Sequence, residues 1–295
     1  MIDLRSLEVF FWVVKLGGFG RAAERLHMTQ PAVSGRISQV EARFNVRLLD
    51  RSGHRAPMPT AKGLELYAYA ERMLALRAEL VARLAEPADL AGTLRLGTAE
   101  TLVHTLLGAL LRELHQLHPR ITPEITVDIS PNLRAGLLAG ELDVALLLGP
   151  VNEPGVRNVV LRDYELAWVA NPALALGDGR LGLAELVRWP ILSYARGTLP
   201  HAQLADVFRG PELPPVRLFA SSSLASIVRM AVDGIGVGIL PRAVVAPDLA
   251  GGRLRLLDVE PALPPLQFTA SYLGTPGSGL AERVSALAAQ LARAS

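Results

Sequence analysis

Short polar side chains gather on one side of a predicted helix near the N-terminus. Thr29 is a favourable N-cap residue, and Pro31 fits the first helical turn, where its missing N–H costs nothing. The other side carries an apolar stripe at helical spacing, formed by Val33, Ile37, Val40 and Phe44. Gln30 and Ser34 are uncharged, Arg36 flanks them, and amide and hydroxyl groups match the hydrogen-bonding edges of bases in a major groove. The pattern predicts a helix that contacts DNA.

Two shorter helices must position this one. Residues 4–16 have the apolar spacing of a helix, and Gly17 and Gly18 stop it. A second helix begins at Phe19, and its small alanines allow another helix to approach closely. A two-residue turn separates it from the third helix, as in a helix-turn-helix motif. A plain three-helix bundle whose third helix is rich in serine would give the same pattern, so that alternative stays open.

A basic segment follows the third helix and contains Arg47, Arg51, His54, Arg55 and Lys62. Residues 55–58 look like a short strand after a turn at Gly53. Basic side chains beside a DNA-reading helix would bind phosphates and fix its register. Residues 1–62 carry ten Lys and Arg against five Asp and Glu, a charge of +5, whereas the rest carry 20 against 23, a charge of −3. The first part therefore suits a polyanionic partner.

These residues resemble those of the LysR-type transcriptional regulators. The matching motifs are Leu4-Arg5-Ser6-Leu7, Phe10, Gly18-Phe19, Arg21-Ala22-Ala23-Glu24-Arg25-Leu26, Thr29-Gln30-Pro31-Ala32-Val33-Ser34, Ile37, Glu41, Leu48-Leu49-Asp50-Arg51 and Pro59-Thr60-Ala61-Lys62-Gly63. The resemblance covers the whole chain and is strongest up to about residue 65. It implies a sequence-specific DNA-binding transcription regulator, not an enzyme, whose C-terminal domain binds a small-molecule effector that alters operator binding or promoter activation.

The resemblance also suggests which residues touch double-stranded operator DNA, and we expect these to be Thr29, Gln30, Pro31, Ser34, Arg36, Arg51 and Arg55. In the family, the residues matching Gln30, Pro31 and Ser34 touch base edges, and the match of Arg51 contacts the backbone. Gly35 departs from the family, which commonly has a base-reading side chain there, often Arg. Whether Gly35 removes a base contact is left open. A glycine inside a helix also costs about 1 kcal/mol relative to alanine.

A long helix is predicted for residues 60–84, which contain no Pro and only one Gly, and it would be roughly 37 Å long. Its apolar residues at helical spacing are Leu66, Ala70, Met73, Leu74, Leu80, Val81 and Leu84. The stripe through Leu66, Ala70, Leu74 and Val81 has no other obvious burial site, so we expect it to join two copies of the chain. The resemblance implies such a dimer and favours the pairing of two dimers into a tetramer. The alternative is that the helix packs on a later domain of its own chain.

From residue 92 onward, strands and helices alternate, which favours an α/β fold with mostly parallel sheets. Strands are predicted at 93–98, 166–170, 191–194, 216–220, 236–240 and 268–273, and helices at 101–114, 224–232 and 279–294. The resemblance implies a winged helix-turn-helix domain, a linker and dimerisation helix, and a two-lobed periplasmic-binding-protein-like effector domain, at 1–59, 60–88 and 92–295. Lobe I would span about 92–161 and 266–295, and lobe II about 162–265.

Ligands of open α/β sheets bind beyond the carboxyl ends of the strands, near helix N-termini. The residues at these positions form the expected effector site: Thr98, Glu100, Thr101, Ser130, Asn132, Tyr194, Arg196, Thr198, Ser221 and Ser222. The hydroxyl groups among them could equally be simple N-caps. Arg196 is the one cation of the set and so the best partner for a carboxylate. Glu100 would repel a carboxylate, pair with Arg196, or bind an amine or hydroxyl group, so the effector stays unnamed.

Several classes of protein are excluded or disfavoured. The chain has no Cys, which excludes disulfides and thiolate catalysis, and it has no G-x-S-x-G, H-E-x-x-H or P-loop motif. His115 and His118 lack a third ligand, so we expect no metal site and no cofactor. No apolar run reaches the roughly 18 residues of a membrane span, and the N-terminus lacks the basic start of a secretory signal. We therefore expect a cytoplasmic protein without a membrane partner.

One alternative of another class remains, a small-molecule-binding or catalytic α/β protein whose N-terminal helices serve only for dimerisation. The basic segment after the third helix and the Gln and Ser face of that helix favour the regulator instead.

Overall fold

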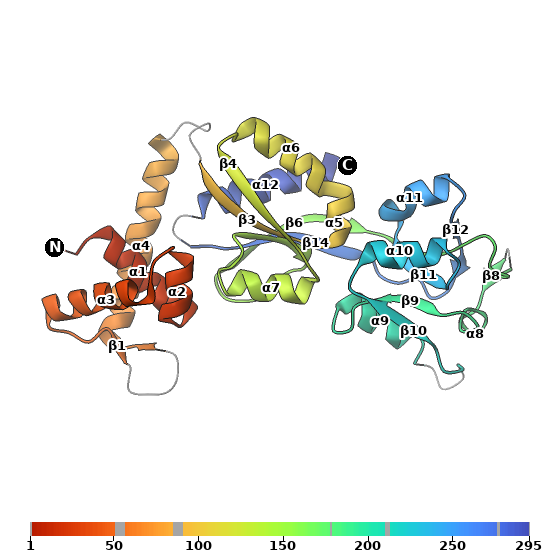
Figure 1. Ribbon diagram of the computed structural model, residues 1–295, viewed down its shortest axis with the longest axis horizontal. Helices are drawn as coiled ribbons and strands as arrows, with labels where there is room; N and C mark the ends of the chain where they lie inside the picture. Colours follow the sequence, from red (N-terminus) through yellow and green to blue (C-terminus); the bar gives the residue numbers. More distant parts are fainter. Residues whose placement is uncertain are drawn as a thin grey trace.

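The computed structural model describes residues 2–50, 57–84, 91–177, 179–209, 213–275 and 278–294 of the chain. Three parts follow one another along its longest axis (Figure 1): a small helical domain, and two lobes that are each built on a five-stranded sheet. Within the described residues, no helix is both long enough and apolar enough to cross a membrane.

Three helices form the N-terminal domain: α1 (Leu4–Leu16), α2 (Phe19–Arg25) and α3 (Gln30–Phe44). Asp3 caps α1, because its Oδ1 accepts a hydrogen bond from the Ser6 N–H at 2.6 Å, and Gly17 ends the helix in the left-handed conformation. Thr29 caps α3 through a hydrogen bond from the Ala32 N–H to its Oγ1. The helices enclose an apolar core that includes Phe10, Phe11, Val33 and Ile37.

A short antiparallel pair of strands, the wing, follows α3 and consists of β1 (Leu49–Asp50) and β2 (Met58–Pro59). Its second strand begins later than the expected 55–58. Arg51, Gly53 and Arg55 lie outside the described residues. Glu41 fixes the wing to α3, since its Oε1 accepts hydrogen bonds from the Leu48 and Leu49 N–H groups at 2.8 and 3.2 Å.

Helix α4 (Ala61–Leu84) packs against α1 of its own chain. The rings of Tyr67 and Phe11 stack with centroids 5.2 Å apart, and Ala70 and Leu74 are buried in the core of the N-terminal domain. Leu66 also packs against this core. We expected the stripe through these residues to have no burial site in its own chain. That expectation is wrong for Leu66, Ala70 and Leu74, because α4 packs on α1 and completes the core of the N-terminal domain.

A second apolar face of α4 remains exposed and consists of Tyr69, Met73, Leu76 and Leu80, which are 45–66% exposed. Their spacing of four, three and four residues places them on one side of the helix. We call this set the outer face of α4. It lies beside the buried face rather than on it, so a partner could cover it without disturbing the domain.

Lobe I is built on a sheet of strand order β4-β3-β5-β14-β6. Its strands are β3 (Gly92–Thr98), β4 (Ile121–Val127), β5 (Val144–Leu148), β6 (Val156–Tyr164) and β14 (Leu266–Leu273). Its helical segments are α5 (Glu100–Leu102), the π-helical turn η2 (Val103–Leu107), α6 (Gly108–Leu117), α7 (Ser130–Leu138) and α12 (Gly279–Ala294). Strands β3, β4 and β5 are parallel, whereas β14 runs antiparallel to both of its neighbours.

Lobe II repeats this plan with the order β10-β9-β11-β7-β12. Its strands are β7 (Leu166–Ala170), β9 (Ile191–Tyr194), β10 (Leu218–Ser221), β11 (Val237–Pro241) and β12 (Arg255–Leu256), with β8 (Arg180–Leu181) pairing separately with β13 (Asp258–Val259). Its helices are α8 (Leu183–Leu186), α9 (Leu199–Val207), α10 (Leu224–Val232) and α11 (Arg242–Ala250). Strands β9, β10 and β11 are parallel, and β7 is antiparallel to β11 and β12.

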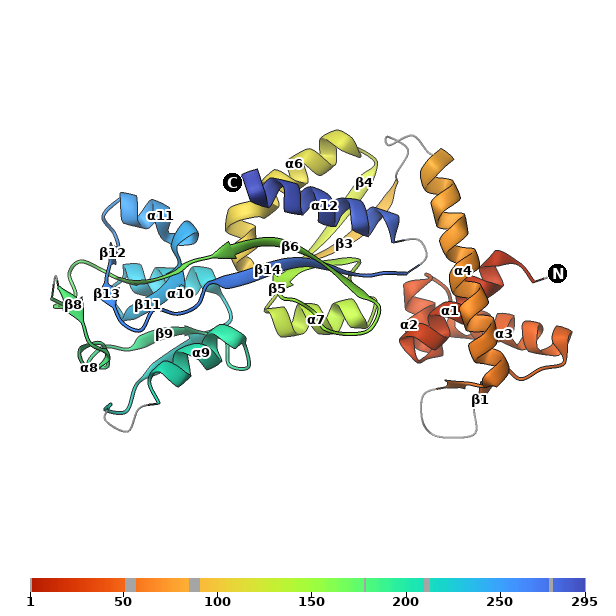
Figure 2. The same ribbon diagram turned by 180° about the vertical axis from the view of Figure 1, so that it is seen from behind.

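Each large sheet is thus mixed rather than mostly parallel as the alternation of elements predicts. The reason lies in the connections between the lobes. Strand β6 carries the chain toward lobe II and β14 brings it back, and the two are paired along their whole length (Figure 2). A strand that leaves and a strand that returns must run in opposite directions, so the sheet of lobe I contains antiparallel neighbours. In lobe II the strand that enters from lobe I, β7, runs antiparallel to β11 and β12.

Candidate DNA-binding helix and interlobe cavity

The polar side of α3 is open to solvent. Thr29, Gln30 and Pro31 are exposed, Ser34 is half-exposed, and the first turn of the helix has no acidic residue. Arg36 lies closer to the domain, with its Nη1 3.8 Å from the Oδ1 of Asp3, the N-cap of α1. The structure therefore brings the uncharged members of the predicted DNA-binding set together and directs Arg36 toward α1. Arg51 and Arg55 fall in the stretch that is not described.

Gly35 lies on the same exposed side. A Cβ atom added at Gly35 would meet no heavy atom within 4 Å, so packing does not require a glycine here.

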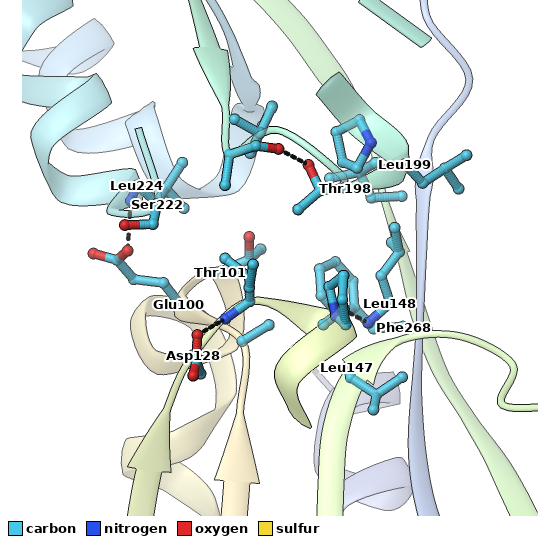
Figure 3. A pocket seen from close by; sticks show the side chains of 18 of the residues that line it. Glu100, Thr101, Asp128, Leu147, Leu148, Thr198, Leu199, Ser222, Leu224 and Phe268 are labelled. Atoms are coloured by element: carbon cyan, nitrogen blue, oxygen red, sulfur yellow. Dashed lines mark hydrogen bonds between the residues drawn. The ribbon is translucent and has the colours of Figure 1, made fainter. Parts of the chain in front are cut away.

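A cavity of about 680 Å³ lies between the two lobes. Seven residues of the predicted effector site line it: Glu100, Thr101, Ser130, Tyr194, Thr198, Ser221 and Ser222. They come from α5 and α7 in lobe I and, in lobe II, from the carboxyl ends of β9 and β10 and the N-cap of α9. Figure 3 shows Glu100 and Thr101 on one side of the cavity and Thr198 and Ser222 on the other. Choosing residues just after the predicted strands therefore identified most of the polar residues that line the cavity.

Three residues of the predicted set do not line the cavity. Thr98 is fully buried in lobe I, where its hydroxyl donates to the carbonyl oxygen of Ala99. Asn132 is exposed on α7 and donates from its side-chain nitrogen to Asp128 at 3.0 Å. Arg196 is exposed in the loop before α9, outside the cavity wall. The expectation that Arg196 would meet a carboxylate in the cavity, or pair there with Glu100, is not supported by its position.

Glu100 instead bridges the lobes. Its Oε2 accepts a hydrogen bond from the Leu224 N–H at 2.5 Å, and its Oε1 accepts from the Ala225 N–H at 2.9 Å and the Ser223 hydroxyl at 3.3 Å. These donors form the N-terminus of α10 in lobe II, where free N–H groups and the helix dipole favour a negative charge. The carboxylate of lobe I thus occupies the anion position of a lobe II helix.

Other hydroxyl groups in the wall are used locally. Ser130 Oγ accepts from the Leu148 N–H at 3.0 Å, and the Thr198 hydroxyl donates to the Ala195 carbonyl oxygen at 2.7 Å. The buried hydroxyl of Tyr194 has no hydrogen-bond partner within the described chain, and burial raises the pKa of Tyr194.

The apolar part of the wall was not predicted. It comes from both lobes and includes Val127, Ile129, Leu147, Leu148, Leu199, Leu266 and Phe268. These residues belong to strands and helix starts whose hydrophobic pattern indicates only core positions, so the sequence offers no signal that separates cavity from core here.

Comparisons with known proteins agree with this architecture. Residues 4–64 match a family model described as "Bacterial regulatory helix-turn-helix protein, lysR family", and residues 87–295 match one described as "LysR substrate binding domain". A relative named "Probable hydrogen peroxide-inducible genes activator" from Streptomyces viridosporus is 31% identical over 257 residues, 85% of this chain and 82% of that protein. The transcriptional regulator BbuR of Bordetella bronchiseptica is 29% identical over 255 residues, 86% of this chain and 78% of BbuR.

Solved structures share the fold over nearly the whole chain. Full-length OxyR from Pseudomonas aeruginosa matches with a TM-score of 0.65 and 24% identity, covering 99% of this chain and 95% of that one. Full-length LysG from Corynebacterium glutamicum with bound effector Arg gives 0.65 and 21%, covering 99% of both. With both family models matched in order along a chain of this fold, the protein belongs to the LysR family of transcriptional regulators and is a DNA-binding regulator with an effector-binding domain rather than an enzyme.

Proposed function

We propose that α3 enters the major groove of operator DNA with Gln30, Pro31 and Ser34 at the base edges. The observation that carries this assignment is the exposed start of α3, whose first turn holds no acidic side chain to repel phosphates. Thr29 would support the turn as the N-cap, and Arg51 and Arg55 would bind phosphates from the wing. Arg36 would lie at the flank of this face, with its Nη1 3.8 Å from Asp3 Oδ1.

Replacing Gln30 by Ala tests this assignment. The variant should lose about 1–3 kcal/mol of binding free energy on the cognate operator and little on random DNA, because a lost base contact removes discrimination rather than phosphate binding. Gln39→Ala is the matched control, since Gln39 is also exposed on α3 but lies about half a turn around the helix. Fluorescence anisotropy at fixed salt measures both. Equal losses on the two DNAs for Gln30→Ala, or a matching loss for Gln39→Ala, would contradict the assignment.

The regulator would act as a dimer joined through the outer face of α4. Four large apolar side chains are exposed there on one side of a 24-residue helix, which is unusual for a face that stays in water. Two dimers could then join into a tetramer through lobe I, where Leu117 and Ile125 are 50% and 41% exposed.

The cavity between the lobes would hold the small-molecule effector, as the bound effector in the LysG structure supports. A ligand there changes operator binding only if it favours one arrangement of the lobes, and a coupling of about 1–3 kcal/mol is enough. The DNA-binding domain, linker helix and effector domain would then span residues 1–59, 60–88 and 92–295. With operator DNA as its partner, the regulator would act in the cytoplasm.

A further inference from the structure

The cavity between the lobes is suited to a molecule with an apolar body. Its volume of about 680 Å³ lies within the range of roughly 300–1,000 Å³ that is usual for small-molecule sites. Side chains such as Ile129, Leu147, Leu199 and Phe268 form much of its wall. Burying apolar surface against them would supply most of the binding free energy.

No unpaired cation stands among the described residues of the wall. Arg134 is the only basic residue there, and its Nε donates to Glu153 Oε2 at 3.2 Å while its Nη2 pairs with Glu153 Oε1. Asp128 adds a negative charge to the wall, and its carboxylate accepts from the Ile129 N–H at 2.7 Å. An anionic ligand in this cavity would therefore meet no free positive charge on the described wall, because Glu153 neutralises Arg134. It would meet the two carboxylates of Asp128 and Glu100.

The chain itself fills the position that a ligand anion would take on α10. The N–H groups of Leu224, which lines the cavity, and of its neighbour Ala225 already donate to the Glu100 carboxylate. A ligand carboxylate could bind them only by displacing Glu100 and leaving two negative charges close together. Desolvating an anion without a paired cation is costly.

Uncharged polar groups, in contrast, find partners. Thr101 is buried and Ser222 exposed, both line the cavity, and neither hydroxyl makes a hydrogen bond within the described chain. A hydroxyl group can donate to a carbonyl or accept from an amide or alcohol, without any charge. The phenol of Tyr194 stays neutral as well, because burial raises its pKa.

We propose that the interlobe cavity selects uncharged, largely apolar effectors that carry a carbonyl, amide or hydroxyl group, and that Glu100 excludes carboxylates by occupying the N-terminus of α10. This rests on the proposal that the cavity is the effector site, and it specifies the ligand class of that site. Glu100 is thus a specificity-determining residue that also ties the two lobes together when no ligand is present.

Matched series of compounds test the proposal on the full-length chain. Phenylacetamide and 2-phenylethanol are compared with phenylacetate, and indole-3-acetamide and 2-(indol-3-yl)ethanol with indole-3-acetate. Hexanamide and 1-hexanol are compared with hexanoate. Thermal shift screens all nine, and calorimetry gives the Kd of those that stabilise the protein. In the wild type, uncharged members should bind and each acid should bind at least about tenfold more weakly than its amide, as expected for a missing charge-assisted partner.

Two substitutions of Glu100 should weaken this preference to different extents. Glu100→Ser frees the α10 N–H groups and removes the charge, so the acids should gain roughly tenfold to a hundredfold in affinity. Glu100→Gln removes the charge but keeps an oxygen that can cap α10, so its gain should be smaller. Glu153→Gln should also strengthen the acids, because it leaves Arg134 unpaired at the wall. Glu141→Gln removes one charge from an exposed site beyond the end of α7 and should change nothing.

The proposal is overturned if an acid binds the wild type more tightly than its own amide and alcohol, or if no uncharged member stabilises the wild type. It is also overturned if Glu100→Ser, with its fold confirmed by circular dichroism, leaves the acids as weak as before. If an acid binds the wild type more tightly than its amide and alcohol and also changes operator affinity, the preference for uncharged ligands is wrong. The proposed function of the protein as an effector-responsive regulator would then still hold. If Leu148→Arg in the cavity wall leaves the affinity of a bound ligand unchanged, the cavity is not the effector site.

Discussion

Two glycines of the N-terminal domain have opposite surroundings. Gly35 is exposed in the middle of α3, and an added Cβ would meet nothing within 4 Å. Gly63 is buried in the first turn of α4, and a Cβ there would lie 2.1 Å from the carbonyl oxygen of Leu48. The first glycine is therefore free of steric constraint, whereas the second lets α4 lie close to the backbone of Leu48, the residue before β1.

Alanine at each position should accordingly act in opposite directions. Gly35→Ala should raise the free energy of unfolding by about 0.5–1 kcal/mol, because alanine loses less backbone freedom in a helix. Gly63→Ala should lower it by more than about 1 kcal/mol, since backbone must move to relieve the overlap. Urea unfolding followed by circular dichroism measures both. A loss of stability in Gly35→Ala would show that Gly35 has a structural role that its open surroundings do not reveal.

At this scale, sequence reasoning succeeded where the cause is local. Thr29 caps α3 because its own hydroxyl reaches an N–H three residues ahead. The role of Glu100 could not be foreseen, because its partners are 123 to 125 residues away and come into reach only when the lobes assemble. The same holds for Arg196, whose position after a strand was read correctly but whose exposure depends on the path of the loop.

At the scale of elements, α4 has two apolar faces with different uses. One face, with Ala70 and Leu74, completes the core of the N-terminal domain. The outer face, with Leu76 and Leu80, is exposed. Spacing alone cannot assign the faces, because both follow the helical period. The sequence therefore predicts the helix but selects the wrong stripe for the partner.

Charges on the outer face should separate the copies without unfolding them. The double variant Leu76→Glu and Leu80→Glu should be monomeric at micromolar concentration by light scattering and should lose tight operator binding, because burying carboxylates in an apolar contact is unfavourable. Ala75→Glu is the matched control, since Ala75 is exposed on another side of α4. Leu74→Glu should instead unfold the N-terminal domain. A dimer that survives the double substitution would place the interface elsewhere.

The alternating elements were predicted well where a strand is a short buried run or a helix has a clear stripe. Strands β7 and β9 and helices α10 and α12 have the expected bounds. Strand β6 was missed because its burial alternates weakly and it includes polar Arg157, Asn158 and Asp163. Helices α9 and α11 were missed as well, since each contains a proline and has only one or two buried side chains.

At the scale of the whole molecule, an ion pair links the N-terminal domain to lobe I. Arg25 of α2 lies 3.1 Å from Asp143 and over the ring of Trp12, and Asp143 also accepts two side-chain hydrogen bonds and one backbone hydrogen bond from Arg95. Burial acts to raise the pKa of Asp143, but the hydrogen bonds from Arg95 and the charge of Arg25 outweigh it, so the pKa is lowered. Burial lowers the pKa of Arg25.

Removing this charge should loosen the domain contact. The pKa of Asp143 is lowered on folding. Its ionised carboxylate therefore contributes fully to the stability of the domain contact above the ordinary pKa of 3.8, and this contribution is lost as the pH falls below that value. Asp143→Asn should therefore lower the stability of the contact by about 1–3 kcal/mol at pH 7, and its difference from the wild type should shrink as the pH falls below 3.8. Limited proteolysis between the domains from pH 3 to 7 measures the effect, with Asp206→Asn as the control in an exposed pair. Equal rates of proteolysis for the wild type and Asp143→Asn at pH 7 would contradict this prediction.

The pairing of β6 with β14 limits how the lobes can move. The strands that lead to and from lobe II are paired as far as Tyr164 and Leu266, so the chain crosses between the lobes at two neighbouring points rather than through two separate linkers. A change in the angle between the lobes is therefore confined to the short segments that follow this pair. Leu266 and Phe268 lie on β14 and also line the cavity. A ligand bound in this cavity, as proposed above, would therefore contact a strand that leads back from lobe II, and its size as well as its chemistry would set the angle between the lobes.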